Sequence, residues 1–240
     1  MNYETLTVAI ANKVATVTLN RPDARNALNA EMCEDLRRVA SGVDPGIRLV
    51  FVRGNGPVFC AGADVKERGG MSVDQVRARR LKAFAAYHAL ESLPMPVVAV
   101  VHGAALGSGV EIAAACDFIV ATPDAAFGTP EALRGTVGAT QRLPRVLGKR
   151  LAKDLMFTGR RLTAAEARAA GFVSRLVTAA ELEHELANIG HSVMLASAEA
   201  IRYAKQCIDR GVELDPQGAL GLELMAIEAQ LASGKGMGKR

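Results

Sequence analysis

Residues 97–117 read VVAVVHGAALGSGVEIAAACD, and this stretch decides which fold the chain can form. Residues 97–101 are rich in β-branched side chains and follow Pro96, which predicts a short buried strand. A glycine-rich turn at 106–111 comes next, and the apolar residues 110–116 predict a buried helix. Because a proline and a histidine interrupt this apolar run and acidic residues follow it, a membrane span is disfavoured. A buried strand, a tight turn and a buried helix in succession indicate an α/β fold.

Strand and helix patterns alternate on both sides of this stretch, and only helix patterns occur near the C-terminus. Alternating or continuous apolar runs predict strands at 6–10, 14–19, 48–52 and 118–121. Residues able to cap a helix precede four further helical patterns, namely Asn29, Ser72, Thr163 and Thr178. In the helix after Ser72, the spacing predicts a buried face formed by Leu81, Phe84, Ala85 and His88. The chain is therefore expected to form an α/β core with a helical C-terminal part.

The composition requires no special scaffold. The chain has 240 residues, half of them hydrophobic, so it can bury a sizeable core without disulfides or metals. The four cysteines, Cys33, Cys60, Cys116 and Cys207, form no CxxC pair and are interpreted as reduced core thiols of a cytosolic protein. The four histidines occur at no metal-ligand spacing, so we predict no metal site. Residues 1–10 lack the pattern of a signal peptide, so we expect a soluble protein in the cytoplasm.

Basic residues exceed acidic residues by 29 to 25, which gives a net charge of +4. Part of this excess lies at 77–82 and 235–240. A solvated helix face is the simplest interpretation of the first cluster. Attraction of a phosphorylated small molecule is the second, and nucleic-acid binding is the third.

Two glycine-rich turns, 59–64 and 106–111, each follow an apolar strand and open toward a helix. Small residues let the backbone approach a ligand closely, and amides at a helix N-terminus have a partial positive charge. Two such turns that meet in space would form an oxyanion hole, although tight packing also explains either turn alone. Ser108 lacks the outer glycines of a GxSxG motif, so we do not assign it as a nucleophile. Glu111 adjoins apolar residues, where an unpaired carboxylate is costly, and either helix-dipole capping or acid/base chemistry would explain it.

Taken together, these segments resemble the enoyl-CoA hydratase/isomerase, or crotonase, family from the first hairpin to about residue 177. The matching motifs occur in the family's order, which is more specific for the family than for the reaction. They are LNRP at 19–22, NAL at 26–28, FCAGAD at 59–64, residues 103–117, FGTPE at 127–131, TQRL at 140–143 and TGRRL at 158–162. The resemblance implies a crotonase-like (ClpP/crotonase) α/β spiral of ββα units over 1–177, with a helical oligomerisation part at 178–240. It also implies a homotrimer or a dimer of trimers.

The same resemblance implies roles for individual residues. The backbone amides of Ala63 and Ser108 would donate to the thioester oxygen, where the charge of an enolate develops. Glu111 would act mainly as the base that activates water for attack at C3, and Glu131 as the acid that protonates C2. Coenzyme A, as part of an acyl-CoA substrate and not as a separate cofactor, would be bound by Arg25, Ala27, Ala61, Asp64 and Lys66. For Arg25 and Lys66, phosphate pairing and ordinary surface charge remain alternatives.

Hydration of a 2-enoyl-CoA is the leading hypothesis, because isomerases that this family includes usually keep a carboxylate only near the Glu131 position. Double-bond isomerisation, or another acyl-CoA reaction at the same site, is the first alternative. A hypothesis of another class, binding instead of catalysis, is that the chain binds RNA. The basic helix residues would then be Arg77, Arg79, Arg80 and Lys82. We prefer a solvated helix face and expect no nucleic-acid partner. A catalytically silent family member is a further alternative.

Two segments depart from the family's pattern. Residues 135–139, GTVGA, lack the proline and about three residues of the loop that flanks the catalytic water in relatives. The shorter loop could enlarge the acyl pocket, move the water or abolish hydration. Residues 232–240 replace a last segment that contains aromatic and basic residues in the family, so a contact between a neighbouring subunit and CoA is in question.

Overall fold

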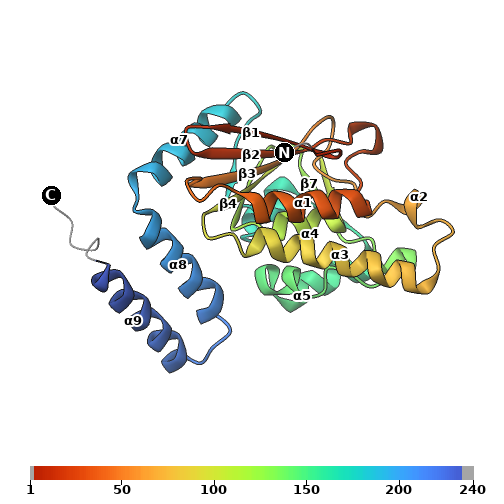
Figure 1. The fold of residues 1–240 in the computed structure, drawn as a ribbon. Helices are drawn as coiled ribbons and strands as arrows, with labels where there is room; N and C mark the ends of the chain where they lie inside the picture. Colours follow the sequence, from red (N-terminus) through yellow and green to blue (C-terminus); the bar gives the residue numbers. More distant parts are fainter. Residues whose placement is uncertain (1–2, 234–240) are drawn as a thin grey trace.

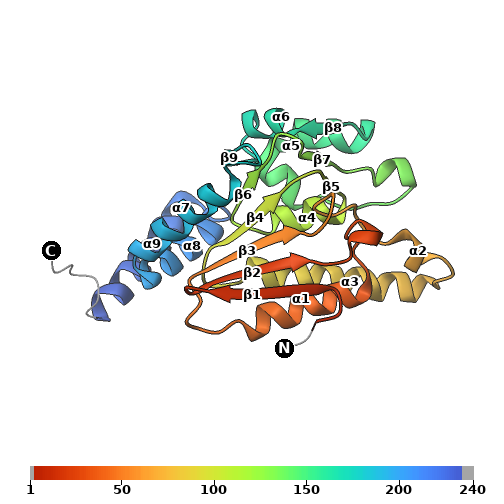
Figure 2. The same cartoon turned by 90° about the horizontal axis from the view of Figure 1, so that it is seen from above.

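The computed structural model of the chain describes residues 3–233 and places most strands in one six-stranded sheet (Figures 1 and 2). The strand order is β1-β2-β3-β4-β6-β9, antiparallel between β1 and β2 and parallel elsewhere. The strands are β1 (Leu6–Ala11), β2 (Val14–Leu19), β3 (Leu49–Gly54), β4 (Val97–Val101), β6 (Phe118–Ala121) and β9 (Arg175–Leu176). The predicted N-terminal hairpin and the predicted strands at 97–101 and 118–121 are confirmed.

A smaller sheet contains β5 (Ala104–Leu106), β7 (Ala126–Gly128) and β8 (Arg161–Thr163). Along the chain, β4 belongs to the large sheet, β5 belongs to the small sheet, and the helix α4 (Ser108–Ala114) follows. The chain repeats this pattern with β6, β7 and, after the short η2 (Ala132–Arg134), α5 (Arg142–Thr158). The repeat is the predicted spiral of ββα units, and it places the start of α4 beside the end of β7.

Helices cover both faces of the large sheet (Figures 1 and 2). Successive side chains of a strand point to opposite faces. Along β3, Val50 and Val52 therefore join the core beneath α1 (Ala30–Gly42) and α3 (Val73–Glu91), whereas Leu49 and Phe51 pack with α7 (Leu182–Leu195). All five residues of β4 are buried, as expected of a central strand.

Local capping predictions hold at three helices. The Asn29 side chain accepts a hydrogen bond from the Met32 N–H at 2.9 Å, and α1 begins at the next residue after Asn29. Ser72 forms a capping box with Gln75 at α3, and Thr163 forms one with Glu166 at α6 (Ala164–Ala169). Thr178 also bonds to Glu181, but α7 begins only at Leu182.

The buried face predicted for α3 is wrong. The residues that this helix buries are Arg79, Ala83, Ala86, Tyr87 and Leu90. Leu81 is 60% exposed, because the helix is rotated so that Arg79 faces the core. Burial of the Arg79 guanidinium is tolerated because the group donates hydrogen bonds to the Glu67 carboxylate and to the Leu28 carbonyl. Hydrophobic spacing misplaced the face because it counts an arginine as a surface residue.

The C-terminal part is helical, as predicted, but its helices differ in how they pack. α7 packs on the sheet, whereas α8 (Ala198–Gly211) and α9 (Pro216–Ala232) form a hairpin that projects from the core (Figure 1). Neither α8 nor α9 buries a residue. The unusual last segment falls mostly outside the described residues. Among residues 3–233, no helix combines the length and the apolar character that crossing a membrane requires.

Three of the four cysteines, Cys33, Cys60 and Cys116, are buried thiols, as predicted, and Cys207 is half-buried. Burial raises the pKa of Cys33 to about 12 and that of Cys60 to about 11, so both stay protonated at neutral pH. Over the described part of the chain, no three His, Cys, Asp or Glu side chains gather as metal ligands would.

Candidate active site

The two glycine-rich turns lie side by side because their backbones are bonded to each other. The Cys60 N–H donates to the Ala104 carbonyl at 3.0 Å, and the Leu106 N–H donates to the Cys60 carbonyl at 2.9 Å. A Cβ atom at Gly109 would collide with the Cys60 carbonyl, so only glycine lets α4 come this close. The start of α4 is thereby held against the 59–64 turn.

Each turn presents one backbone amide that has no partner among the described residues. The Leu28 N–H donates to the Gly62 carbonyl, and the Asp64 N–H donates to the Leu28 carbonyl, both at 2.8 Å. Because peptide groups alternate along an extended chain, the Ala63 N–H between them points away from Leu28. Ser108 is the first residue of α4, where the N–H has no partner within the helix. Within residues 3–233 neither amide donates a hydrogen bond, and both residues line one cavity of about 90 Å³.

Glu111 lies one helical turn after Ser108 and lines the same cavity. Its side chain is buried, with the whole residue only 7% exposed. Arg142 Nη1 donates to Glu111 Oε2 at 3.1 Å, and Ala139 lines the cavity beside this carboxylate. Burial raises the pKa of Glu111 above its usual range, while the hydrogen bond and charge of Arg142 oppose that increase. The carboxylate is thus desolvated but paired.

Arg142 links Glu111 to a second carboxylate outside the cavity. Its Nη2 donates to Glu91 Oε2 at 2.7 Å, and its Nε donates to Glu91 Oε1 at 3.3 Å. The guanidinium also lies 5.7 Å from the centroid of the Tyr87 ring, and Tyr87 lines the same cavity as Ser108. Sequence reasoning missed both residues. Arg142 belongs to the TQRL motif, but nothing in the sequence indicated a role for it at the site. No motif or spacing pointed to Tyr87.

Glu131 reaches the cavity from the loop between β7 and η2. A Cβ atom at Gly107 would lie 2.7 Å from Glu131 Oε1, so glycine at this position leaves room for the carboxyl group. Glu131 Oε2 is buried and has no hydrogen-bond partner among residues 3–233. Burial raises the pKa of Glu131, and the charge of Glu111 raises it further, while Arg134 and Arg80 act in the opposite direction. The two glutamates therefore line one cavity in different electrostatic surroundings.

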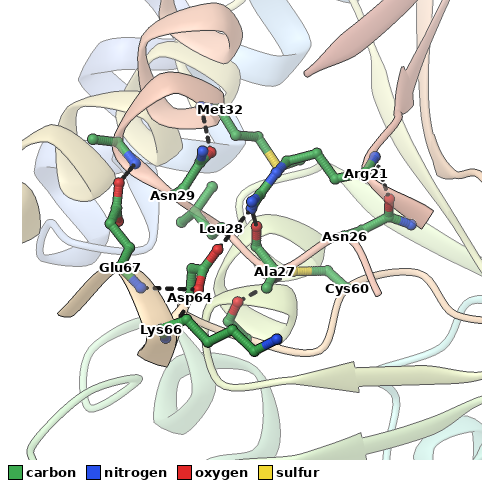
Figure 3. A network of polar contacts seen from close by, with 12 residues as sticks. Arg21, Asn26, Ala27, Leu28, Asn29, Met32, Cys60, Asp64, Lys66 and Glu67 are labelled. Carbon is green, nitrogen blue, oxygen red and sulfur yellow. Dashed lines mark hydrogen bonds and ion pairs between the residues drawn. The ribbon is translucent and has the colours of Figure 1, made fainter. Parts of the chain in front are cut away.

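The residues predicted to bind CoA lie on two bonded loops (Figure 3). The Ala61 N–H donates to the Arg25 carbonyl at 3.0 Å, which places these two residues side by side. The Arg25 and Lys66 side chains are exposed.

Asp64 has a structural task in these loops. Its Oδ1 accepts from the N–H groups of Lys66 and Glu67, at 3.1 and 3.2 Å, and so caps α2 (Val65–Arg68). Its Oδ2 pairs with Arg21 Nη1 at 3.0 Å, and Arg21 also donates to the Ala27 carbonyl. These contacts engage the Asp64 carboxylate in holding the loop, and its role in CoA binding stays a prediction. The sequence motif contained Arg21 but showed no reason to link it to Asp64.

Comparisons with known proteins agree with this architecture. The family model described as enoyl-CoA hydratase/isomerase matches residues 9–237. A short-chain-enoyl-CoA hydratase of Clostridium acetobutylicum is 37% identical over 217 residues, which cover 88% of this chain and 83% of that protein. The crystal structure of an enoyl-CoA hydratase from Bacillus anthracis is 35% identical and superposes with a TM-score of 0.92, covering 95% of this chain and 92% of that one. A Thermobifida fusca protein solved in complex with acetoacetyl-CoA is 28% identical, with a TM-score of 0.87 and 95% of both chains covered. The chain is an enzyme of the enoyl-CoA hydratase/isomerase family and has the crotonase fold.

Proposed function

We propose that this enzyme hydrates 2-enoyl-CoA thioesters to 3-hydroxyacyl-CoA in the cavity described above. The observation that supports this most directly is the composition of that cavity. Two backbone amides without a partner among residues 3–233, of Ala63 and Ser108, and two carboxyl groups, of Glu111 and Glu131, come from three segments and line one space of about 90 Å³. Coenzyme A enters as part of the substrate, and the reaction needs no separate cofactor.

In the proposed reaction the thioester oxygen accepts hydrogen bonds from the amides of Ala63 and Ser108. Glu111 takes a proton from water as its oxygen attacks C3, and the electron pair of the double bond moves onto the thioester as an enolate. Glu131 then protonates C2, which restores the thioester carbonyl. The loss of one oxyanion donor typically costs roughly 3 kcal/mol of transition-state stabilisation. The water oxygen stays on C3, and the proton passes to Glu111.

The surroundings of the two glutamates support this division of roles. Glu111 accepts a hydrogen bond from Arg142, and the hydrogen bond and the positive charge both favour its ionised form. Glu131 Oε2 is buried without a donor among the described residues, which favours the protonated form. Environments that push two carboxyl groups toward different protonation states are typical of an acid and base pair.

Two conservative variants test the proposal. Glu111→Gln and Glu131→Gln should each reduce the hydration of crotonyl-CoA by roughly 10²- to 10⁴-fold, the usual contribution of one positioned acid or base. Glu183→Gln, at a side chain 71% exposed that pairs with Arg53, is the control and should hydrate crotonyl-CoA like the wild type. Undiminished hydration by Glu111→Gln would reject the assigned base. Double-bond isomerisation of a 3-enoyl-CoA that persists in Glu111→Gln and disappears in Glu131→Gln would instead identify an isomerase, which needs no water.

The structure offers little support for RNA binding by α3. Of its basic residues, Arg79 is buried against Glu67 and Leu28, and Arg77 pairs with Asp74 at 2.5 Å. We therefore retain a small-molecule function. A cytoplasmic location is part of the proposal, because the cysteines among the described residues are all unpaired.

We further propose a homotrimer or a dimer of trimers, with α8 and α9 in the contact. Both helices expose large apolar side chains that the rest of residues 3–233 leaves uncovered. They include Ile208, Leu220, Leu224, Met225, Ile227 and Leu231. Apolar surface of this kind marks an interaction site in most proteins.

A further inference from the structure

One face of α3 forms a wall of the catalytic cavity. Val76, Arg80, Ala83, Phe84 and Tyr87 all line the cavity and recur at intervals of three and four residues, the spacing of one helix face. Tyr87 lies at the reacting end, because its ring lies beside the Arg142 guanidinium that donates to Glu111. Arg80 comes seven residues earlier, which is about 10 Å along the axis at 1.5 Å per residue. The wall thus leads from the thioester site to a positively charged side chain.

Most N–H donors of the Arg80 guanidinium have no acceptor among residues 3–233. Its Nη1 donates to the Val137 carbonyl at 2.8 Å, and within residues 3–233 this side chain forms no ion pair. A guanidinium carries five N–H donors, so one carbonyl satisfies only a small part of it. The other arginines of α3 differ in this respect. Arg79 pairs with Glu67 and Arg77 pairs with Asp74.

The position of Val137 brings this charge close to the catalytic acid. Its neighbour Gly138 packs on Glu131, since a Cβ atom at Gly138 would lie 3.1 Å from Glu131 Cγ. The Arg80 charge opposes the increase of the Glu131 pKa. A second arginine, Arg68 at the end of α2, also lines the cavity and has no ion pair within the described residues. Three arginines therefore border the cavity, and two of them, Arg68 and Arg80, have no ion pair among residues 3–233, whereas Arg79 is paired with Glu67. The neighbouring wall residues Val76 and Phe84 are apolar.

We propose that Arg80, assisted by Arg68, binds a carboxylate at the far end of the acyl chain, so that the preferred substrate is a short 2-enoyl-CoA ending in a carboxylate. This inference rests on the proposed hydratase function. An unbranched alkyl tail would need only the apolar wall and would leave the guanidinium partly desolvated without an anion, which is costly. A carboxylate matches the planar donor pattern of arginine, and such charge-assisted hydrogen bonds are among the strongest that a site can offer. The small cavity favours a chain of few carbons.

The test compares two substrates that differ at the far end in charge and by one methyl group. They are a five-carbon 2-enoyl-CoA that ends in a carboxylate and its methyl ester, each measured as kcat/KM for hydration. The wild type should prefer the carboxylate by about 10- to 100-fold, the value of one hydrogen bond to a charged group. Arg80→Met should lose at least about tenfold of this preference, and Arg80→Lys, which keeps the charge, should retain part of it. Arg77→Met removes an arginine that lies outside the cavity on the same helix, and it should keep the wild-type preference.

Three results would overturn the inference, and they are distinct. Equal losses with both substrates in Arg80→Met would mean that Arg80 acts on Glu131 and not on the acyl chain. A wild type that hydrates the ester as well as the carboxylate would refute the inference and leave the hydratase function intact. No hydration of either substrate, or of crotonyl-CoA, would reject the proposed function together with the inference.

Discussion

Glu111 and Glu131 both line the cavity, but their carboxyl groups have different hydrogen-bond partners. Glu111 is paired with Arg142, and Glu131 Oε2 lacks a donor among residues 3–233. Because they interact, the two groups titrate as a pair. The base must be ionised and the acid protonated, so the hydration rate should fall at both ends of the pH range. Burial raises the pKa of both groups, which moves this bell-shaped profile to higher pH than free carboxyl groups would give.

The contact between Arg142 and Glu111 has a measurable consequence. Arg142 opposes the increase that burial causes in the pKa of Glu111, so Arg142→Met should raise that pKa further. A base with a higher pKa is protonated earlier as the pH falls, and the acidic limb of kcat/KM for crotonyl-CoA should shift to higher pH. The pH dependence of hydration measures this shift.

A second arginine of α5 provides the control for this prediction. Arg145 pairs with Glu213 on the surface, with both side chains more than half exposed. Arg145→Met should leave the acidic limb in place. If the limb in Arg142→Met also stays in place, the ion pair does not set the protonation of Glu111, and Arg142 has only a packing role against Tyr87.

At the scale of elements, the site depends on how closely α4 approaches the 59–64 turn. Gly109 lies against the Cys60 carbonyl, and Gly107 adopts a positive φ of 50° beside the Glu131 carboxyl. Short helices and tight turns of this kind transmit a small displacement directly to the Ser108 amide. Oxyanion-hole donors stabilise the transition state only at hydrogen-bond distance. A small displacement of the Ser108 amide should therefore reduce the rate.

Gly109→Ala should therefore destabilise the protein and reduce its activity together. The added methyl group has no space, and overpacking typically costs about 1–3 kcal/mol. Urea unfolding measures the change in stability, and kcat for crotonyl-CoA measures the shift of the Ser108 amide. Gly190→Ala in α7 is the matched control, because a Cβ atom there meets nothing within 4 Å. It should stabilise the protein by up to about 1 kcal/mol through helix propensity. Equal stability of the two variants would contradict the proposed close packing of α4.

At the scale of the whole molecule, apolar side chains are buried around the large sheet but are exposed on α8 and α9. Two clusters pack on the faces of the large sheet, whereas the α8–α9 hairpin is joined to the core by few contacts. One of them is the ion pair between Lys205 Nζ and Asp117 Oδ1 at 2.9 Å. Neither helix fully buries a residue within the described part of the chain, so another surface is needed to cover their apolar side chains.

The proposed assembly can be weakened at this hairpin. Leu224 and Met225 are 54% and 71% exposed on α9, and replacing both with glutamate would place charges in the proposed contact. Sedimentation velocity should show a trimer or hexamer for the wild type and smaller species for Leu224→Glu/Met225→Glu. Gln217→Glu adds a charge to an exposed position at the start of the same helix and should leave the assembly unchanged. A wild type that sediments as a monomer would refute the proposed assembly without touching the catalytic assignments.

The sequence by itself determined most elements of the core and the identity of the candidate groups. The hairpin, the caps at Asn29, Ser72 and Thr163, and the two glycine-rich turns follow from preferences that act over a few residues. Such preferences can be recognised in a single sequence because each depends on neighbours along the chain. The two glutamates were identified for the same reason, together with the family resemblance of their motifs.

Only the tertiary structure decided what these groups touch. Arg142 bonds to Glu111 across 31 positions of sequence, and Arg80 reaches the carbonyl of Val137 across 57. The rotation of α3 that buries Arg79 also depends on a partner, Glu67, that belongs to another helix. No local pattern specifies such contacts, because they depend on how whole elements pack, and a charged side chain is buried only where that packing supplies its partner.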